Sequence, residues 1–534
     1  MKRSCFALTA LILTVALLLS GCGLDYVGYF QRLAAMFGPV SFANMEYTRP
    51  DLSRLDEVLE DCVDSAAGKD LDQLVGHINT FNSICNNYST NYYLAYIHYC
   101  IDMTDSYWKT EYDYCVDQST TVQAAVDELM YALADSPLRS ELEGEDYFGP
   151  DYFEDYDGES IWTEEFTALM DQEAVLISEY YDLSAKAGLM DTWSEEFYST
   201  VGAQMEELYV ELVLLRRQIA QEAGYDSYPE FAYDFYYHRD YTPEQTAGLL
   251  ADIRQELVGV YLKLSGSDIW TKGLQASEEY STLRYVKTMA ENMGGTVGEA
   301  FDLMQESDLY HISYSPNKFD SSFEVYLPDY AVPYVFVNPT LTNRDHLTFA
   351  HEFGHFCNDY ASMGADVGID VAEFFSQGME YLSLCYADGG EDLAAMKMAD
   401  SLCVYVEQSA LADFEDRVYR LEGQLTKEQI SELYGQVTRE YGFGDLVDSR
   451  SYVTVTHLFT SPLYVISYVV SNDAAMQLYQ MELAEPGSGL DCYRGQLSTQ
   501  QSDFLTFVKW AGLTSPFAEG RIQAVKKTFE EILK

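Results

Sequence analysis

The chain has 534 residues, 48% of them hydrophobic, so its core is substantial and we expect two lobes or one large helical body. Asp and Glu number 87 against 31 Lys and Arg, and the formal net charge of −56 excludes nucleic-acid binding, because such a surface repels phosphate backbones and anionic headgroups. We interpret the acidity as that of a highly soluble surface, in preference to a trap for cationic substrates.

Residues 1–21 resemble the signal peptide of a bacterial lipoprotein. Lys2 and Arg3 give a charged start, and the apolar run that follows is too short to span a bilayer comfortably. The run closes on LSGC, which is similar to a lipobox, so we expect lipidation of Cys22. This predicts a linker over 22–45 and a place on the extracytoplasmic face of the cell membrane, with no other membrane contact. An ordinary secretory signal is the alternative.

The cysteines leave the pairing of thiols open. Eight remain when Cys5 and Cys22 are set aside, and an exported protein can form disulfides from an even number. No two of them show C-x-x-C spacing, and buried thiols fit a chain of this size equally well.

Beyond the anchor, the chain reads as helical nearly throughout. Thr242 begins one helix with a capping box closed by Gln245, and apolar residues then follow at helical spacing. The same device recurs at Thr426.

One place breaks the helical pattern. FEVYL (323–327) and YVFV (334–337) are short β-type runs bounded by prolines, with Pro333 between them. We expect them to form a small antiparallel β element, and Thr342 to cap the helix that follows. The edge of such a sheet can hold an extended peptide through main-chain hydrogen bonds.

That helix carries HEFGH at residues 351–355, in a chain with only eight histidines. Residues four apart lie about 40° apart around a helix, so His351 and His355 can bind one tetrahedral metal ion. Glu352, about 100° round, can hold a water molecule beside it. Gly354 costs about 1 kcal/mol relative to alanine in mid-helix, so we expect another segment to approach closely there. A satisfied surface histidine pair is the alternative, but it leaves the strands unexplained.

A catalytic zinc site normally takes three protein ligands and leaves one position for water. Glu373 and Glu380 lie seven residues apart, on one face of the next expected helix. Gly364 and Gly368 allow the chain to reverse, so this helix can return beside the first. Either carboxylate would complete a His₂Glu set, which suits Zn²⁺ in peptide hydrolysis.

Several blocks resemble peptidase family M3, the thimet oligopeptidase-like peptidases, and most closely the oligoendopeptidase F branch. The resemblance covers roughly residues 200–534, and its motif is more specific than HExxH alone. The blocks are residues 218–232, 337–355, 370–382, 455–475 and 504–522.

The resemblance implies a mainly α, two-lobed, zincin-like metallopeptidase with a deep substrate channel. It divides the chain into an N-terminal helical domain over 46–200 and a catalytic domain over 201–534. It places one Zn²⁺ ion on His351, His355 and Glu373, and it makes Glu352 the catalytic glutamate.

His457 matches the downstream histidine of the family, and Tyr464 and Tyr468 align with its aromatic positions after an offset of one residue. We expect these side chains to donate hydrogen bonds to the tetrahedral oxyanion. A buried histidine satisfied by a carbonyl is the alternative for His457. Glu380 lies about 10 Å beyond Glu373 along the helix, so it is expected to orient a ligand histidine from behind.

The function that follows is a zinc-dependent oligoendopeptidase acting on internal bonds of short peptides at the extracellular membrane face. Glu352 would take the proton of the attacking water and deliver it to the leaving amine. A peptide-binding lipoprotein with an inactive metallopeptidase fold is one alternative, although such binders are usually α/β. A related HExxH carboxypeptidase is the other.

Overall fold

The computed structural model describes residues 40–532, apart from positions 145, 146, 150, 151, 154, 155, 158–160, 189, 265–268, 270, 272, 320 and 366. The predicted signal peptide and the anchor at Cys22 lie outside the described residues. Among the helices that are described, none combines the length and apolar composition that a bilayer-spanning segment needs.

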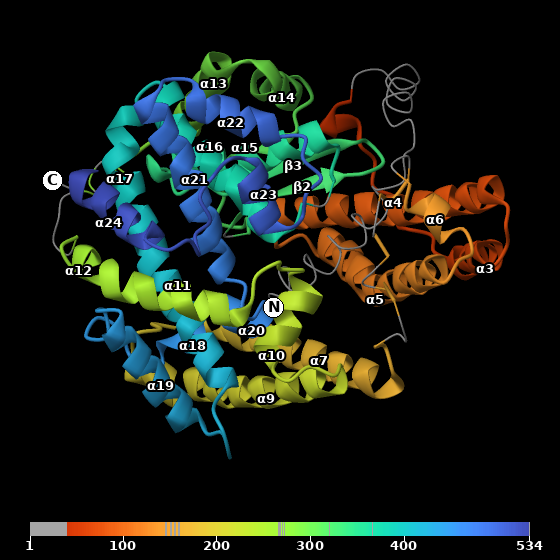
Figure 1. Ribbon diagram of the computed structural model, residues 1–534, viewed down its shortest axis with the longest axis horizontal. Coiled ribbons are helices and arrows are strands. Elements are labelled where there is room, and N and C mark those ends of the chain that lie inside the picture. The colour runs from red at the N-terminus through yellow and green to blue at the C-terminus, as the bar shows by residue number, and fades with distance from the viewer. Residues whose placement is uncertain are drawn as a thin grey trace.

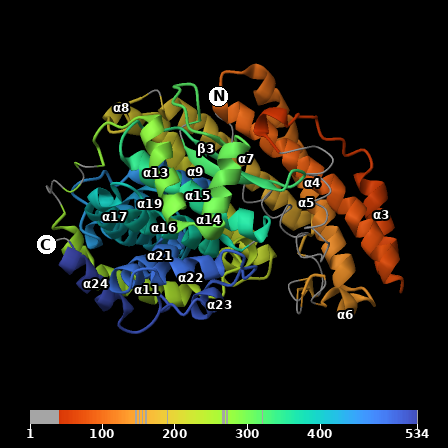
Figure 2. The same cartoon turned by 90° about the horizontal axis from the view of Figure 1, so that it is seen from above.

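The N-terminal helices form a group of their own at one side of the molecule (Figures 1 and 2). Two long helices dominate this group and pack against each other, and a shorter third helix packs on both. A 3₁₀ turn, η1 (Phe42–Asn44), precedes the group, which consists of α3 (Leu55–Ala66), α4 (Leu71–Ile101), α5 (Ser106–Ala134) and α6 (Arg139–Leu142).

The next helices begin the larger body of the molecule. Its first two long helices, α7 and α9, pack together across the predicted domain boundary at residue 200. The elements are α7 (Glu164–Ala187), α8 (Glu195–Ser199), α9 (Val201–Glu222), α10 (Tyr228–Phe231), the π-helical η3 (Ala232–Tyr236), α11 (Pro243–Glu256), α12 (Val258–Tyr261), α13 (Glu279–Met293) and α14 (Gly295–Glu306).

The remaining helices surround the pair that carries the histidines and the predicted glutamates. They are α15 (Arg344–Ser362), α16 (Ile369–Tyr386), α17 (Gly390–Cys403), η5 (Val404–Gln408), α18 (Ser409–Tyr419), α19 (Lys427–Glu440), η6 (Ser451–Thr454), α20 (Thr456–Thr460), α21 (Ile466–Ala484), α22 (Ser488–Gln496), α23 (Phe504–Trp510) and α24 (Arg521–Ile532). The mainly helical fold is confirmed.

Both predicted capping boxes are present. The Thr242 side chain accepts from the backbone N–H of Gln245, whose side chain binds the N–H of Thr242 in return, and Thr426 begins α19 in the same way. The prediction that Thr342 caps the histidine helix is wrong. α15 begins after Asn343, and the Asp345 carboxylate instead binds the backbone N–H of Thr340 at 2.8 Å and that of Thr342 at 3.1 Å.

The predicted strand pair is confirmed as β2 (Ser322–Leu327) and β3 (Val332–Val337), which run antiparallel. A further strand, β1 (Tyr310–His311), pairs parallel with β3, so the sheet has the order β1-β3-β2 and is not purely antiparallel. Pro333 lies inside β3, opposite Tyr326, and does not separate the runs as predicted. It is the second residue of the strand, near the strand end where a missing N–H is tolerated best.

The sheet joins the N-terminal helices to the histidine helix. β2 and β3 both pack on α15. The ring of Phe323 in β2 stacks on Tyr96 of α4 at 4.7 Å and on Phe336 of β3 at 4.7 Å. β3 is buried along its whole length. The histidine helix therefore packs against a fully buried strand of this sheet.

The close approach predicted at Gly354 is confirmed. A Cβ there would lie 2.5 Å from the carbonyl oxygen of Phe375 and 2.6 Å from the Cα of Ser376, so only glycine lets α16 pack this tightly on α15. Gly364 and Gly368 have φ angles of +71° and +67°, and the chain reverses there as predicted. The reversal brings α16 back beside α15.

Candidate metal centre

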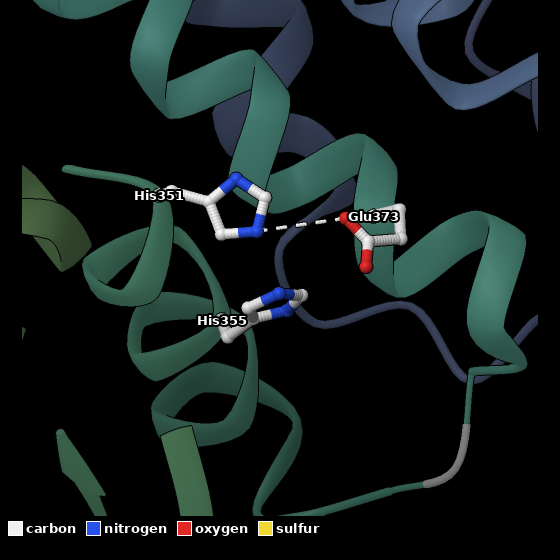
Figure 3. A group of neighbouring side chains, drawn as sticks. All are labelled: His351, His355 and Glu373. Atoms are coloured by element: carbon white, nitrogen blue, oxygen red, sulfur yellow. Dashed lines mark ion pairs between the residues drawn. The ribbon is translucent and has the colours of Figure 1, made fainter. Parts of the chain in front are cut away.

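The helix pair brings His351, His355 and Glu373 together (Figure 3). Their ligand atoms all lie within 4.8 Å of one another. Nε2 of His351 is 3.6 Å from Oε2 of Glu373, and the two imidazole centroids are 5.2 Å apart. Two imidazole nitrogens and one carboxylate oxygen are a donor set that suits a catalytic zinc ion.

Glu380 lies behind His351, on the side away from Glu373. Its Oε1 is 2.8 Å from Nδ1 of His351, and Lys397 of α17 donates to its Oε2 at 2.8 Å. Burial raises the pKa of Glu380, but the Lys397 charge and the His351 hydrogen bond have the larger opposite effect. The pKa therefore falls to about 2. The ionised carboxylate therefore holds the proton on Nδ1, which leaves Nε2 of His351 to bind a metal ion.

The electrostatics of the cluster favour a cation between these side chains. Burial lowers the pKa of His351, but the hydrogen bond to Glu380 and the charge of Glu373 outweigh it and raise that pKa to about 9. Burial and the His351 charge lower the pKa of His355 to about 3, so that imidazole is neutral and its nitrogens can bind metal. A metal ion would replace the proton that the cluster otherwise stabilises on His351.

Glu352 belongs to the same turn of α15 and is only 7% exposed. Burial raises its pKa to about 7; the His351 charge opposes this shift and the Glu373 charge adds to it. A carboxyl group with this pKa can both accept and release a proton near neutral pH, as a general base that becomes a general acid must do.

The downstream residues reach the cluster from α20, the following loop and α21. The ring of His457 lies 5.3 Å from that of Tyr464 and 6.0 Å from that of Tyr468, and the tyrosine rings are 5.2 Å apart. The hydroxyl of Tyr464 donates to Oε1 of Glu373 at 3.0 Å. Burial lowers the pKa of His457, so its imidazole is neutral at pH 7 and carries one N–H donor.

Two contacts of the site were not predicted. Tyr464 binds a candidate metal ligand, whereas the sequence suggested only an oxyanion donor. The other is the bond from Lys397 to Glu380. The sequence signal for it is that Lys397 stands between two methionines in a buried stretch of helix, where an ammonium group needs an anionic partner.

Comparisons with solved structures identify the fold. The chain superposes on "putative Oligoendopeptidase F" with a TM-score of 0.80 at 22% identity, over 92% of this chain and 98% of that one. The oligoendopeptidase F fold is confirmed. Pz peptidase A, solved with an inhibitor, gives a TM-score of 0.80 at 22% identity over 92% and 99% of the two chains. A putative oligoendopeptidase F from Bacillus anthracis gives 0.77 at 21% identity over 92% and 98%.

Residues 42–159 match the Peptidase M3 N-terminal domain, in a part of the chain where the sequence alone shows only compatible helices. The comparison with curated proteins gave no match. The domain match and the oligoendopeptidase F fold together support the M3 peptidase family.

Proposed function

We propose that this chain is a zinc-dependent oligoendopeptidase that hydrolyses internal peptide bonds of short peptides. The observation that carries the proposal is the convergence of His351, His355 and Glu373 beside the buried carboxyl group of Glu352. The oligoendopeptidase F fold supports it independently.

The side chains of the cluster have distinct parts in this reaction. A Zn²⁺ ion bound by the three ligands would polarise the scissile carbonyl and acidify a water molecule. Glu380 and Lys397 hold His351 in the tautomer and orientation that binding requires. Glu352 accepts the proton of the attacking water and passes it to the leaving amine.

The downstream residues divide between ligand and substrate. Tyr464 donates to Glu373 and so orients the third ligand. The neutral imidazole of His457 and the hydroxyl of Tyr468 supply the donors for the oxyanion, a contribution typically worth about 3 kcal/mol per donor.

In this proposal the substrate peptide binds along the edge strand β2. The order β1-β3-β2 leaves β2 at an edge, and β2 packs beside the histidine helix. An extended peptide paired with this edge would be held through its main chain, which demands no particular side chain.

Hydrolysis of an internally quenched fluorescent peptide tests the proposal. We expect cleavage that a chelator abolishes and added zinc restores. Blocking the carboxyl terminus of the peptide should leave cleavage intact, whereas loss on blocking would identify a carboxypeptidase. Peptide binding without cleavage, in protein shown to contain zinc, would identify an inactive binder and contradict the proposal.

We also propose that the enzyme is lipid-anchored at Cys22 on the extracytoplasmic face of the membrane, on the strength of the LSGC sequence. Labelled fatty acid should enter the wild-type precursor and be absent from Cys22→Ala. Incorporation into that variant would contradict the anchor while leaving the peptidase proposal intact.

A further inference from the structure

The loop between α20 and α21, which carries Tyr464, is bound by side chains from distant parts of the chain. The hydroxyl of Tyr237 donates to the carbonyl of Pro462 at 2.8 Å. The backbone N–H of Leu463 donates to Glu415 of α18 at 2.7 Å. Leu463 has a φ of 64°, a left-handed conformation that is unfavourable for leucine, so these bonds hold a backbone shape that the loop would not keep by itself.

Arg239 joins this loop to α21 and to α16. One guanidinium nitrogen donates to the carbonyl of Leu463 at 3.0 Å and another to the hydroxyl of Ser467, in the first turn of α21, at 2.8 Å. Its Nε lies 3.6 Å from the carboxylate of Asp370, three residues before Glu373 on α16. The Arg239 side chain is fully buried, so these contacts are shielded from water.

The geometry points to Arg239 and Tyr237 as positioning residues: they fix the backbone of residues 462–463, and thereby bring the Tyr464 hydroxyl to Glu373 and the Tyr464 ring onto His457. The distances that this arrangement sets are 3.0 Å between the hydroxyl and Glu373 Oε1, and 5.3 Å between the ring centroids. The effect on turnover rests on the proposed function, whereas the effect on the loop does not.

Tyr237→Phe tests the inference with little disturbance, because it removes only a hydroxyl. The ring remains over Arg239, whose Cζ lies 4.3 Å from its centroid. Tyr233→Phe is the matched control: its ring lies 4.4 Å from the same Cζ, but its hydroxyl binds Thr246 and not the loop.

We expect amide hydrogen exchange in the peptide spanning residues 461–467 to quicken about 10-fold in Tyr237→Phe, because a buried hydrogen bond is lost. The Kd for zinc should rise about 10-fold, since Glu373 loses its orientation. The kcat should fall about 10-fold with KM unchanged. Tyr233→Phe should match the wild type in all three measurements. Unchanged exchange and zinc affinity in Tyr237→Phe would overturn the inference.

A double-mutant cycle with Tyr464→Phe separates positioning from a general loss of stability. If Tyr237 acts through Tyr464, its substitution should change zinc affinity and kcat far less in the Tyr464→Phe background. Equal effects in both backgrounds would overturn the inference. Arg239→Lys, which keeps a charge beside Asp370, should reproduce the faster exchange. If the wild type cleaves no peptide, the proposed function fails, while exchange and zinc affinity still decide this inference.

Discussion

The helix pair α15–α16 and the segment from His457 to Tyr468 meet at the same cluster. They differ in how far apart along the chain the residues lie that hold each of them in place. The pair supplies all three candidate ligands within 23 residues, through a four-residue spacing, a glycine contact and one reversal of the chain. The downstream segment touches Glu373 from 91 residues away and is held by side chains of α18 and of the loop after η3. Helical spacing and one chain reversal thus position the candidate ligands, whereas long-range hydrogen bonds position the residues beside them.

Glu352→Gln should produce the largest effect and separates chemistry from metal binding in the helix pair. The amide cannot accept a proton, so kcat should fall about 10³-fold, while zinc stays bound because its ligands are intact. Turnover assays and metal analysis on the same sample check this. Glu391→Gln, in the exposed first turn of α17, is the control. A near wild-type rate in Glu352→Gln would contradict the assigned role.

His457→Ala tests the downstream segment in the same way. If this imidazole donates to the oxyanion, the bond matters chiefly in the transition state, so kcat should fall roughly 10²–10³-fold with KM and zinc content nearly unchanged. Steady-state kinetics and metal analysis distinguish the possibilities. Unfolding, or loss of the metal, would show that His457 is structural or a ligand.

Glu373→Ala and Glu380→Ala compare a candidate metal ligand with the carboxylate that orients the ligand His351. Removing Glu373 deletes one of three donors, so zinc affinity should fall more than about 100-fold. Removing Glu380 leaves the donors in place but frees the His351 ring, and a fall of about 10-fold is expected. Competition titrations with a zinc chelator give both values. The reverse ranking would mean that Glu380 is the ligand.

Gly354→Ala tests the close packing of α15 on α16. The added methyl group would meet the backbone of α16, so the free energy of unfolding should fall by about 1–3 kcal/mol. Gly248→Ala is the matched control, since nothing lies within 4 Å of the added Cβ on that exposed helix position. It should stabilise the protein by about 1 kcal/mol. Denaturant unfolding checks both, and equal stability of the two variants would contradict the packing described.

The features that the sequence predicts correctly are those that depend on residues close together in the chain. The capping boxes at Thr242 and Thr426, the strand pair and the ligand spacing depend on neighbours a few residues apart, and all are present. β1 has only two residues, too few for any periodicity to appear. The predicted cap at Thr342 is absent because α15 begins one residue later, after Asn343, and the Asp345 carboxylate in its first turn binds the amides of Thr340 and Thr342, which precede the helix.

The partners of the site could not be predicted, because each depends on the packing of separate elements. Lys397 meets Glu380 only when α17 packs on α16. Tyr464 meets Glu373 only when the loop before α21 adopts a left-handed residue at Leu463. No spacing in the sequence encodes either contact.

Anomalous diffraction at the zinc absorption edge, on crystals of the zinc-loaded protein, tests the central claim most directly. We predict one strong peak within about 2.0–2.2 Å of a nitrogen of His351, a nitrogen of His355 and a carboxylate oxygen of Glu373. A peak bound by other side chains, or no peak between these three in protein that contains zinc, would contradict it.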